Sequence, residues 1–127
     1  MAAGRYTFIV EQGATTDFEV EWKDKNGAAV DLAGYTGRMQ IRSDYGSGGT
    51  LYANLTSTTG SDGTGLSLYG SGGVLPLASG SIGIYISATS SSAFTFDEAV
   101  YDLEMRKGTE VTRLLSGKVK LSKEVTV

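Results

Sequence analysis

Carboxylates are the side chains in this sequence that could take part in the widest range of chemistry. A pair of acids could hydrolyse a glycosidic bond, provided that one of them has its pKa raised in a partly buried, apolar setting. The candidate acids instead alternate with apolar residues, as the solvated outer face of a sheet does. We therefore expect no catalytic pair. The candidates are Glu19, Glu21, Asp102 and Glu104.

A second group of acids lies in expected loops and could bind calcium. Calcium requires several oxygen ligands at short, fixed spacing, whereas each loop here has one acid or an adjacent pair whose side chains diverge. The sequence has no histidine and no cysteine, which removes the commonest general base and metal ligand and every thiolate site. We expect no metal, no cofactor and no enzymatic activity. The acids considered are Asp44, Asp62, Asp97 and Glu98.

Glycine clusters at 46–50, 60–65 and 70–73 could in principle cradle a phosphate. Such a loop needs a strand before it and a helix after it, and no helix is expected after any of the three. Lys and Arg number 11 against 14 Asp and Glu, with no basic run, so we expect no nucleic-acid partner. The apolar stretch at the start of the sequence is too short for a signal peptide, and no apolar segment is long enough to span a membrane. We therefore expect the protein to be made in the cytoplasm and to have no membrane partner.

Four tyrosines fall outside the expected core and form our candidate assembly surface. Three of them lie within a region, 43–79, that carries few charges, and the fourth belongs to an uncharged strand face formed by Gly83, Tyr85 and Ser87. Uncharged surface favours subunit contacts, because desolvating charge at an interface is costly. Mobile glycine-rich loops remain the alternative, as does a weak carbohydrate contact on exposed rings. The four are Tyr45, Tyr52, Tyr69 and Tyr85.

These side chains must be positioned by strands, and the clearest strand signal runs through residues 17–42. Apolar and charged residues alternate around Val20 and again around Met39, a period of two that indicates strands with one buried face. Asn26-Gly27 favours a tight hairpin turn between them. Trp22 is the largest side chain available to fill the core. The expected core is Phe8, Phe18, Val20, Trp22, Met39, Ile41, Ile84, Tyr101, Leu103 and Met105.

Further strands are expected from the same alternation in the rest of the chain, at 5–11, 51–55, 66–69, 80–87, 101–106, 110–115 and 118–127. Residues 88–96 read as a crossover with one helical turn near 90–94, and Ser116-Gly117 as a bulge. Seven to nine strands joined by short connections predict an all-β, antiparallel sandwich, with a barrel as the alternative. We expect one domain, 1–127, with a long glycine-rich loop region at about 43–80.

Three stretches carry a resemblance to a known group of proteins: QGATTDFEVEWKDKNGAAVDLAGYTGRMQIR, GSIGIYISATSS and AVYDLEMRKGTEVTRLLSGKVKLSKEVTV. Together they resemble small virion structural proteins of tailed bacteriophages, including the N-terminal modules of baseplate and fibre-associated proteins. The resemblance implies an immunoglobulin-like β-sandwich and a virion part present in many copies, which contacts other virion proteins and copies of itself. A tail, baseplate or fibre-attachment role is expected. A head decoration (cement) protein and a carbohydrate-binding module for host adsorption are the alternatives.

Overall fold

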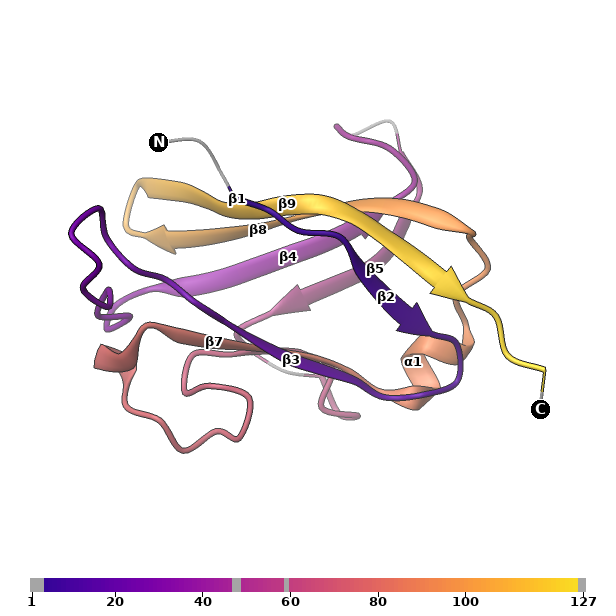
Figure 1. Ribbon diagram of the computed structural model, residues 1–127, viewed down its shortest axis with the longest axis horizontal. Helices are drawn as coiled ribbons and strands as arrows, with labels where there is room; N and C mark the ends of the chain where they lie inside the picture. The colour runs from indigo at the N-terminus through magenta and orange to yellow at the C-terminus, as the bar shows by residue number, and fades with distance from the viewer. Residues whose placement is uncertain (1–3, 47–48, 59, 126–127) are drawn as a thin grey trace.

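Two β-sheets packed face to face make up the computed structural model, which describes residues 4–46, 49–58 and 60–125 (Figure 1). The larger sheet has the order β1-β9-β8-β4-β5, with β2 also paired to β9, and the smaller has the order β3-β7-β6. The elements are β1 (Gly4–Arg5), β2 (Phe8–Glu11), β3 (Thr16–Glu21), β4 (Thr36–Arg42), β5 (Leu51–Thr56), β6 (Gly65–Ser67), η1 (Leu77–Ser79), β7 (Ser81–Ile86), α1 (Ala88–Ser92), β8 (Glu98–Lys107) and β9 (Glu110–Ser122).

The expected hairpin between the strands around Val20 and Met39 is wrong, because β3 and β4 belong to different sheets. Asp24 closes a smaller turn of its own. Its Oδ1 accepts hydrogen bonds from the N–H groups of Asn26 (2.8 Å) and Ala28 (3.0 Å), and Gly27 has a φ of +83°. The chain then crosses to the other sheet through a connection in which Leu32 is fully buried.

Among the strands that the structure describes, pairing is antiparallel except at the N-terminal strands. Both β1 and β2 run parallel to β9, with Phe8 opposite Val119. Short connections impose antiparallel pairing only on strands that follow one another in the same sheet. The turn after β2 leads to β3 in the other sheet, so it places no such restriction on β2.

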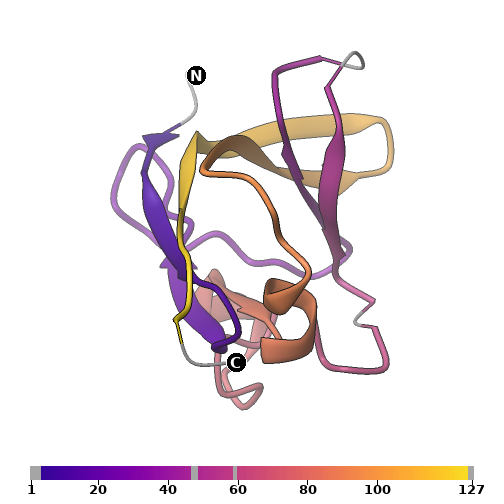
Figure 2. The same ribbon diagram turned by 90° about the vertical axis from the view of Figure 1, so that its right-hand side faces the viewer.

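The helical turn lies slightly earlier than expected, at Ala88–Ser92, and closes one end of the sandwich against the turn after β2 (Figure 2). Ser91 makes this contact: its Oγ accepts from the Gly13 N–H (3.1 Å) and donates to the Ala14 carbonyl (2.8 Å). This contact ties together two segments that are far apart in the sequence.

The irregularity in the β8–β9 pair is not at Ser116-Gly117 as expected. The register shifts where Leu103 pairs with Leu115 and Glu104 with Arg113, so Leu114 is the extra residue. Gly117 has a different reason to be glycine. A Cβ at that position would overlap the backbone carbonyl oxygen of Tyr6 as the N-terminal chain passes over β9.

The core lies between the sheets and contains most of the residues expected there. Three expected core residues are only partly buried and pack against its margin: Phe18, Val20 and Trp22. The reason is that β3 is an edge strand of the smaller sheet, so one flank of its inward side chains is open. Trp22 packs edge-to-face on Tyr35, with ring centroids 5.2 Å apart. The expected residues that are buried are Phe8, Met39, Ile41, Ile84, Tyr101, Leu103 and Met105.

Candidate interaction surface

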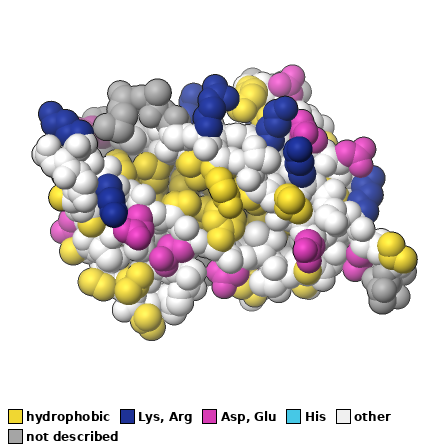
Figure 3. Space-filling view, viewed as in Figure 1, with side chains coloured by type: hydrophobic (Ala, Val, Ile, Leu, Met, Phe, Trp, Pro, Cys, Tyr) yellow, Lys and Arg dark blue, Asp and Glu magenta, His cyan; other side chains and the backbone are white. Residues whose placement is uncertain are grey.

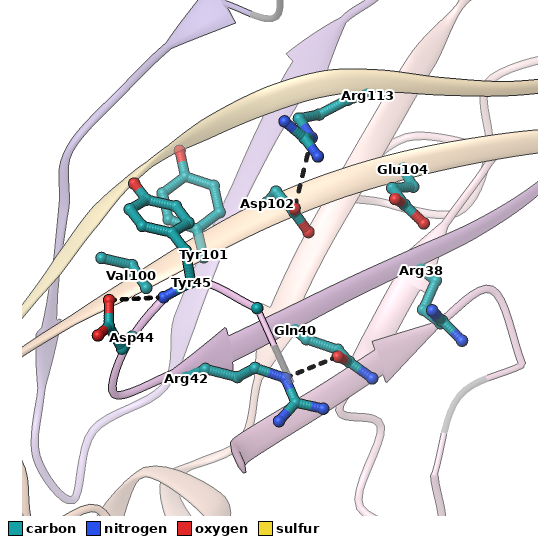
Figure 4. A pocket seen from close by; sticks show the side chains of 11 residues that line it. Arg38, Gln40, Arg42, Asp44, Tyr45, Val100, Tyr101, Asp102, Glu104 and Arg113 are labelled. Carbon is teal, nitrogen blue, oxygen red and sulfur yellow. Dashed lines mark hydrogen bonds and ion pairs between the residues drawn. The ribbon is translucent and has the colours of Figure 1, made fainter. Parts of the chain in front are cut away.

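A shallow hollow of about 300 Å³ lies on the outer face of the larger sheet, over β4, β8 and β9 (Figure 4). Alternation along the strands builds it. Gln40 lies between buried Met39 and Ile41, and Asp102 between buried Tyr101 and Leu103, so the polar side chains point outward together. Its charged, polar and aromatic lining includes Arg38, Gln40, Arg42, Asp44, Tyr45, Asp102, Glu104 and Arg113.

Opposite charges face one another across this hollow. Arg38 of β4 lies opposite Glu104 of β8, which in turn lies opposite Arg113 of β9. The Arg113 Nε is 3.5 Å from an Asp102 carboxylate oxygen. The pKa of Asp102 is raised, first by burial and then by the charge of Glu104, while the two arginines oppose the increase. The face therefore presents two acids between flanking arginines.

Arg42 and the loop after β4 form one end of the hollow. The Arg42 guanidinium donates to the Gln40 side-chain oxygen (3.0 Å) and to the Gly49 carbonyl (3.1 Å), which holds the loop against the sheet. Tyr45, on the same loop, is 57% exposed. Exposed aromatic rings and arginines are enriched at protein interfaces, and this end of the hollow offers both.

The four tyrosines of the candidate assembly surface do not share one face. Tyr45 lines the charged hollow, whereas Tyr85 is half-buried on the outer face of the smaller sheet. Tyr69 is 51% exposed and lines a separate hollow, beside Tyr35. Tyr52 is half-buried and packs against Phe96 with the two rings tilted, their centroids 4.6 Å apart. Selecting residues by their absence from the core could not reveal which sheet face each ring occupies.

The uncharged strand face expected to meet a neighbouring subunit is covered by the chain itself. A Cβ at Gly83 would lie 2.7 Å from the Ser71 Cα and 2.8 Å from the Gly70 carbonyl oxygen, so the 70–73 turn rests directly on β7. The Ser71 N–H donates to the Glu19 carboxylate (2.8 Å), which holds the turn in place. The absence of charge on β7 therefore reflects an intramolecular contact.

The sequence predicts Asp102 and Glu104 as acids of a solvated sheet face and Asp44 as a loop acid, but it does not predict that they lie beside the arginines of this hollow. The register between neighbouring strands brings these residues together, and this register cannot be read from the local sequence pattern. Over residues 4–46, 49–58 and 60–125, no group of three or more acids is arranged to hold a metal ion. In the same described residues, no helix is long and apolar enough to cross a membrane.

Asp62, considered above as a possible calcium ligand, instead holds the loop before β6 to the start of α1. Its carboxylate accepts hydrogen bonds from the hydroxyls of Ser87 (2.5 Å) and Ser90 (2.7 Å) and from the Thr64 N–H (3.0 Å). These bonds, the one from Ser87 foremost, lower the pKa of Asp62 well below its usual range. The ionised carboxylate thus acts as a tether.

We expect Asp62→Asn to destabilise the protein at pH 7 and to weaken its response to acid. Because the folded-state pKa is depressed, the stability from the ionised carboxylate is fully present above the unfolded value of 3.8 and is lost progressively as the pH falls from there through the lower folded-state pKa. Urea unfolding of both proteins at pH 7 and pH 3 measures this. The difference between them should shrink at pH 3, and an unchanged difference would contradict the tether.

Comparison with known proteins supports the fold. No protein-family model matches the sequence, and no curated protein matches it. Among solved structures, a crystal structure of chicken TCR is similar, with a TM-score of 0.56 and 13% sequence identity. The match covers 94% of this chain and 54% of the other, so this chain spans about half the length of that one. At this identity the similarity shows the fold alone. The chain has an immunoglobulin-like antiparallel β-sandwich fold, as the sequence resemblance implied.

Proposed function

We propose that the chain is a structural component of a tailed-phage virion, in the tail, the baseplate or a fibre attachment, and that it acts through subunit contacts. The sequence resemblance supports the virion setting. The observation that carries the mode of action is the hollow on the larger sheet, where arginines and acids alternate beside the exposed ring of Tyr45. Charge patterns of this kind select a partner and set its orientation.

The pattern suits repeated assembly because each copy offers both signs of charge. Arg38 and Arg113 flank Glu104 in the strand register, so a neighbouring surface can pair with either sign. Closed symmetric assemblies reuse one such patch in every copy. A head decoration protein would use the same contacts at another place on the particle. The carbohydrate alternative has less support, since the tyrosines that would form its platform lie apart.

We expect the double variant Arg38→Glu, Arg113→Glu to remain folded, with a lower stability because both new acids lie opposite Glu104, and to enter particles at least about tenfold less. The reversal gathers acids around Asp102 and Glu104, and like charges at an interface cost several kcal/mol. Copies per particle, counted by quantitative mass spectrometry of purified virions, measure the effect. Lys120→Glu is the matched control, because Lys120 is exposed on β9 and is not part of the hollow's lining.

Normal incorporation of the double variant, with Lys120→Glu also normal, would refute the role of this face. Cryo-electron microscopy of wild-type particles then separates the settings. Density for the chain at the tail end supports a tail, baseplate or fibre role, and density on the capsid lattice supports decoration. Particles that contain no copy of the chain would refute the virion proposal as a whole.

A further inference from the structure

The smaller sheet ends at β3, and among the described residues β3 pairs with β7 alone. In immunoglobulin-like domains a strand of the N-terminal segment commonly occupies the position beyond this one, in the same sheet. Here the N-terminal strands β1 and β2 pair with β9 of the other sheet instead. The described part of the chain therefore leaves one strand position next to β3 unfilled.

Backbone groups along this edge point outward in a regular row. The Trp22 N–H donates to the Gly80 carbonyl (2.8 Å), which sets the phase of the pairing with β7. The backbone N–H and C=O groups of the residues two and four positions before Trp22 have the same phase, so they also point toward β7. It follows that the N–H and C=O groups of Asp17, Glu19 and Glu21 point to the open edge, where a further strand could bond to them.

An apolar strip runs beside this edge, between β3 and β1 (Figure 3). Tyr6 is 49% exposed and its ring centroid lies 6.0 Å from that of Phe18, which in turn lies 5.0 Å from that of Phe8. Val20 and Leu115 are only partly buried against the core. Every second side chain of a strand added beside β3 would cover this strip and remove it from water.

The charges on β3 determine which strand fits. Asp17, Glu19 and Glu21 project from the outer face at alternate positions. A second copy pairing antiparallel through its own β3, with Glu19 at the centre, would place Asp17 opposite Glu21 and Glu19 opposite itself. Like charges directly opposite one another destabilise a strand pair. The Glu19 carboxylate already accepts a hydrogen bond from the Ser71 N–H, and a Glu21 carboxylate oxygen lies 3.8 Å from Lys23 Nζ. Both residues are nevertheless exposed, so the side chains of a partner can reach them.

We propose that an extended segment of a partner protein, with apolar side chains alternating with Lys or Arg, docks along β3 and completes the smaller sheet. Its backbone would bond to the open edge, its apolar side chains would cover Tyr6 and Phe18, and its basic side chains would face the acids of β3. This surface is separate from the charged hollow, so the proposal stands independently of the virion role.

The test uses the whole chain and a capped peptide of about eight residues in which Val and Lys alternate. In NMR titration we expect shifts centred on β3 and stronger protection from hydrogen exchange at the amides of Asp17, Glu19 and Glu21. A peptide with Glu in place of Lys tests charge, and one N-methylated at alternate residues tests backbone pairing. Both should bind at least about tenfold more weakly, since each removes several contacts.

Two variants at one position separate charge from hydrogen bonding. Glu21→Pro and Glu21→Thr both remove the carboxylate, but only proline also removes an N–H that points to the open edge, a change that edge strands tolerate. We expect the proline variant to bind the Val–Lys peptide at least about threefold more weakly than the threonine variant. The proposal is overturned if the Val–Lys peptide causes no shifts, if its shifts centre on β5 or β6, or if the N-methylated peptide binds as well.

Discussion

Replacing Leu103 with alanine is expected to lower the free energy of unfolding by about 2–5 kcal/mol. Leu103 is fully buried in β8, opposite Met39 of β4 and Leu115 of β9. Leu103 lies two residues after Tyr101. In many immunoglobulin-like domains the residue two positions after a tyrosine of this strand is a cysteine, which forms a disulfide bond with the other sheet. This chain has no cysteine, so packing across the sandwich must hold the sheets together without that bond.

Urea unfolding monitored by circular dichroism measures the loss, and Val111→Ala is the matched control. Val111 lies on β9 and is 49% exposed, so its truncation should change stability by no more than about 0.5 kcal/mol. If the two variants lost the same amount, Leu103 would not be a central contact between the sheets.

The core face of most strands could be predicted from the sequence, whereas the partners of the strands could not. The alternation around Met39, Ile84 and Leu103 is a local signal, and all three side chains are buried. Sheet membership is a long-range property. At Asn26-Gly27 only Gly27 has a positive φ (+83°), so the expected positive-φ pair of a tight hairpin turn does not form. The chain crosses to the other sheet after this turn, and on the way the Leu32 N–H donates to the Leu77 carbonyl (3.0 Å).

A local sequence pattern also does not indicate whether a strand lies at the edge or in the centre of its sheet. For this reason some residues predicted to be buried are only partly buried. Phe18 and Trp22 have the right phase for the core, but they belong to or follow an edge strand and remain partly open. The same limit applies to the candidate site. Arg38 and Glu104 are far apart in the sequence and meet only through the register of β4 with β8. The sequence predicts that the four tyrosines lie outside the core, but it does not predict which sheet face each ring occupies.

Gly117→Ala is expected to detach β1 and β2 from β9 and to cost about 3 kcal/mol, the upper part of the usual range for a point substitution. The added Cβ would overlap the Tyr6 carbonyl oxygen. Tyr6 cannot easily yield, because its N–H donates to the Ser116 carbonyl (3.0 Å) and its carbonyl accepts from the Tyr101 hydroxyl (2.6 Å). Relief of the overlap would therefore require breaking the hydrogen bond of the Tyr6 N–H and that of the Tyr6 carbonyl.

Native-state hydrogen exchange distinguishes local detachment from general destabilisation. In Gly117→Ala, amides of β2 should lose protection far more than those of β7, because β2 pairs only with β9 among the described strands. Gly4→Ala is the matched control on the same strand pair, since a Cβ there meets Leu115 Cδ1 at 3.5 Å, an ordinary contact. Equal loss of protection in β2 and β7 would mean that Gly117 supports the whole sandwich, whereas full protection in β2 would show that the strands can pass one another without a glycine.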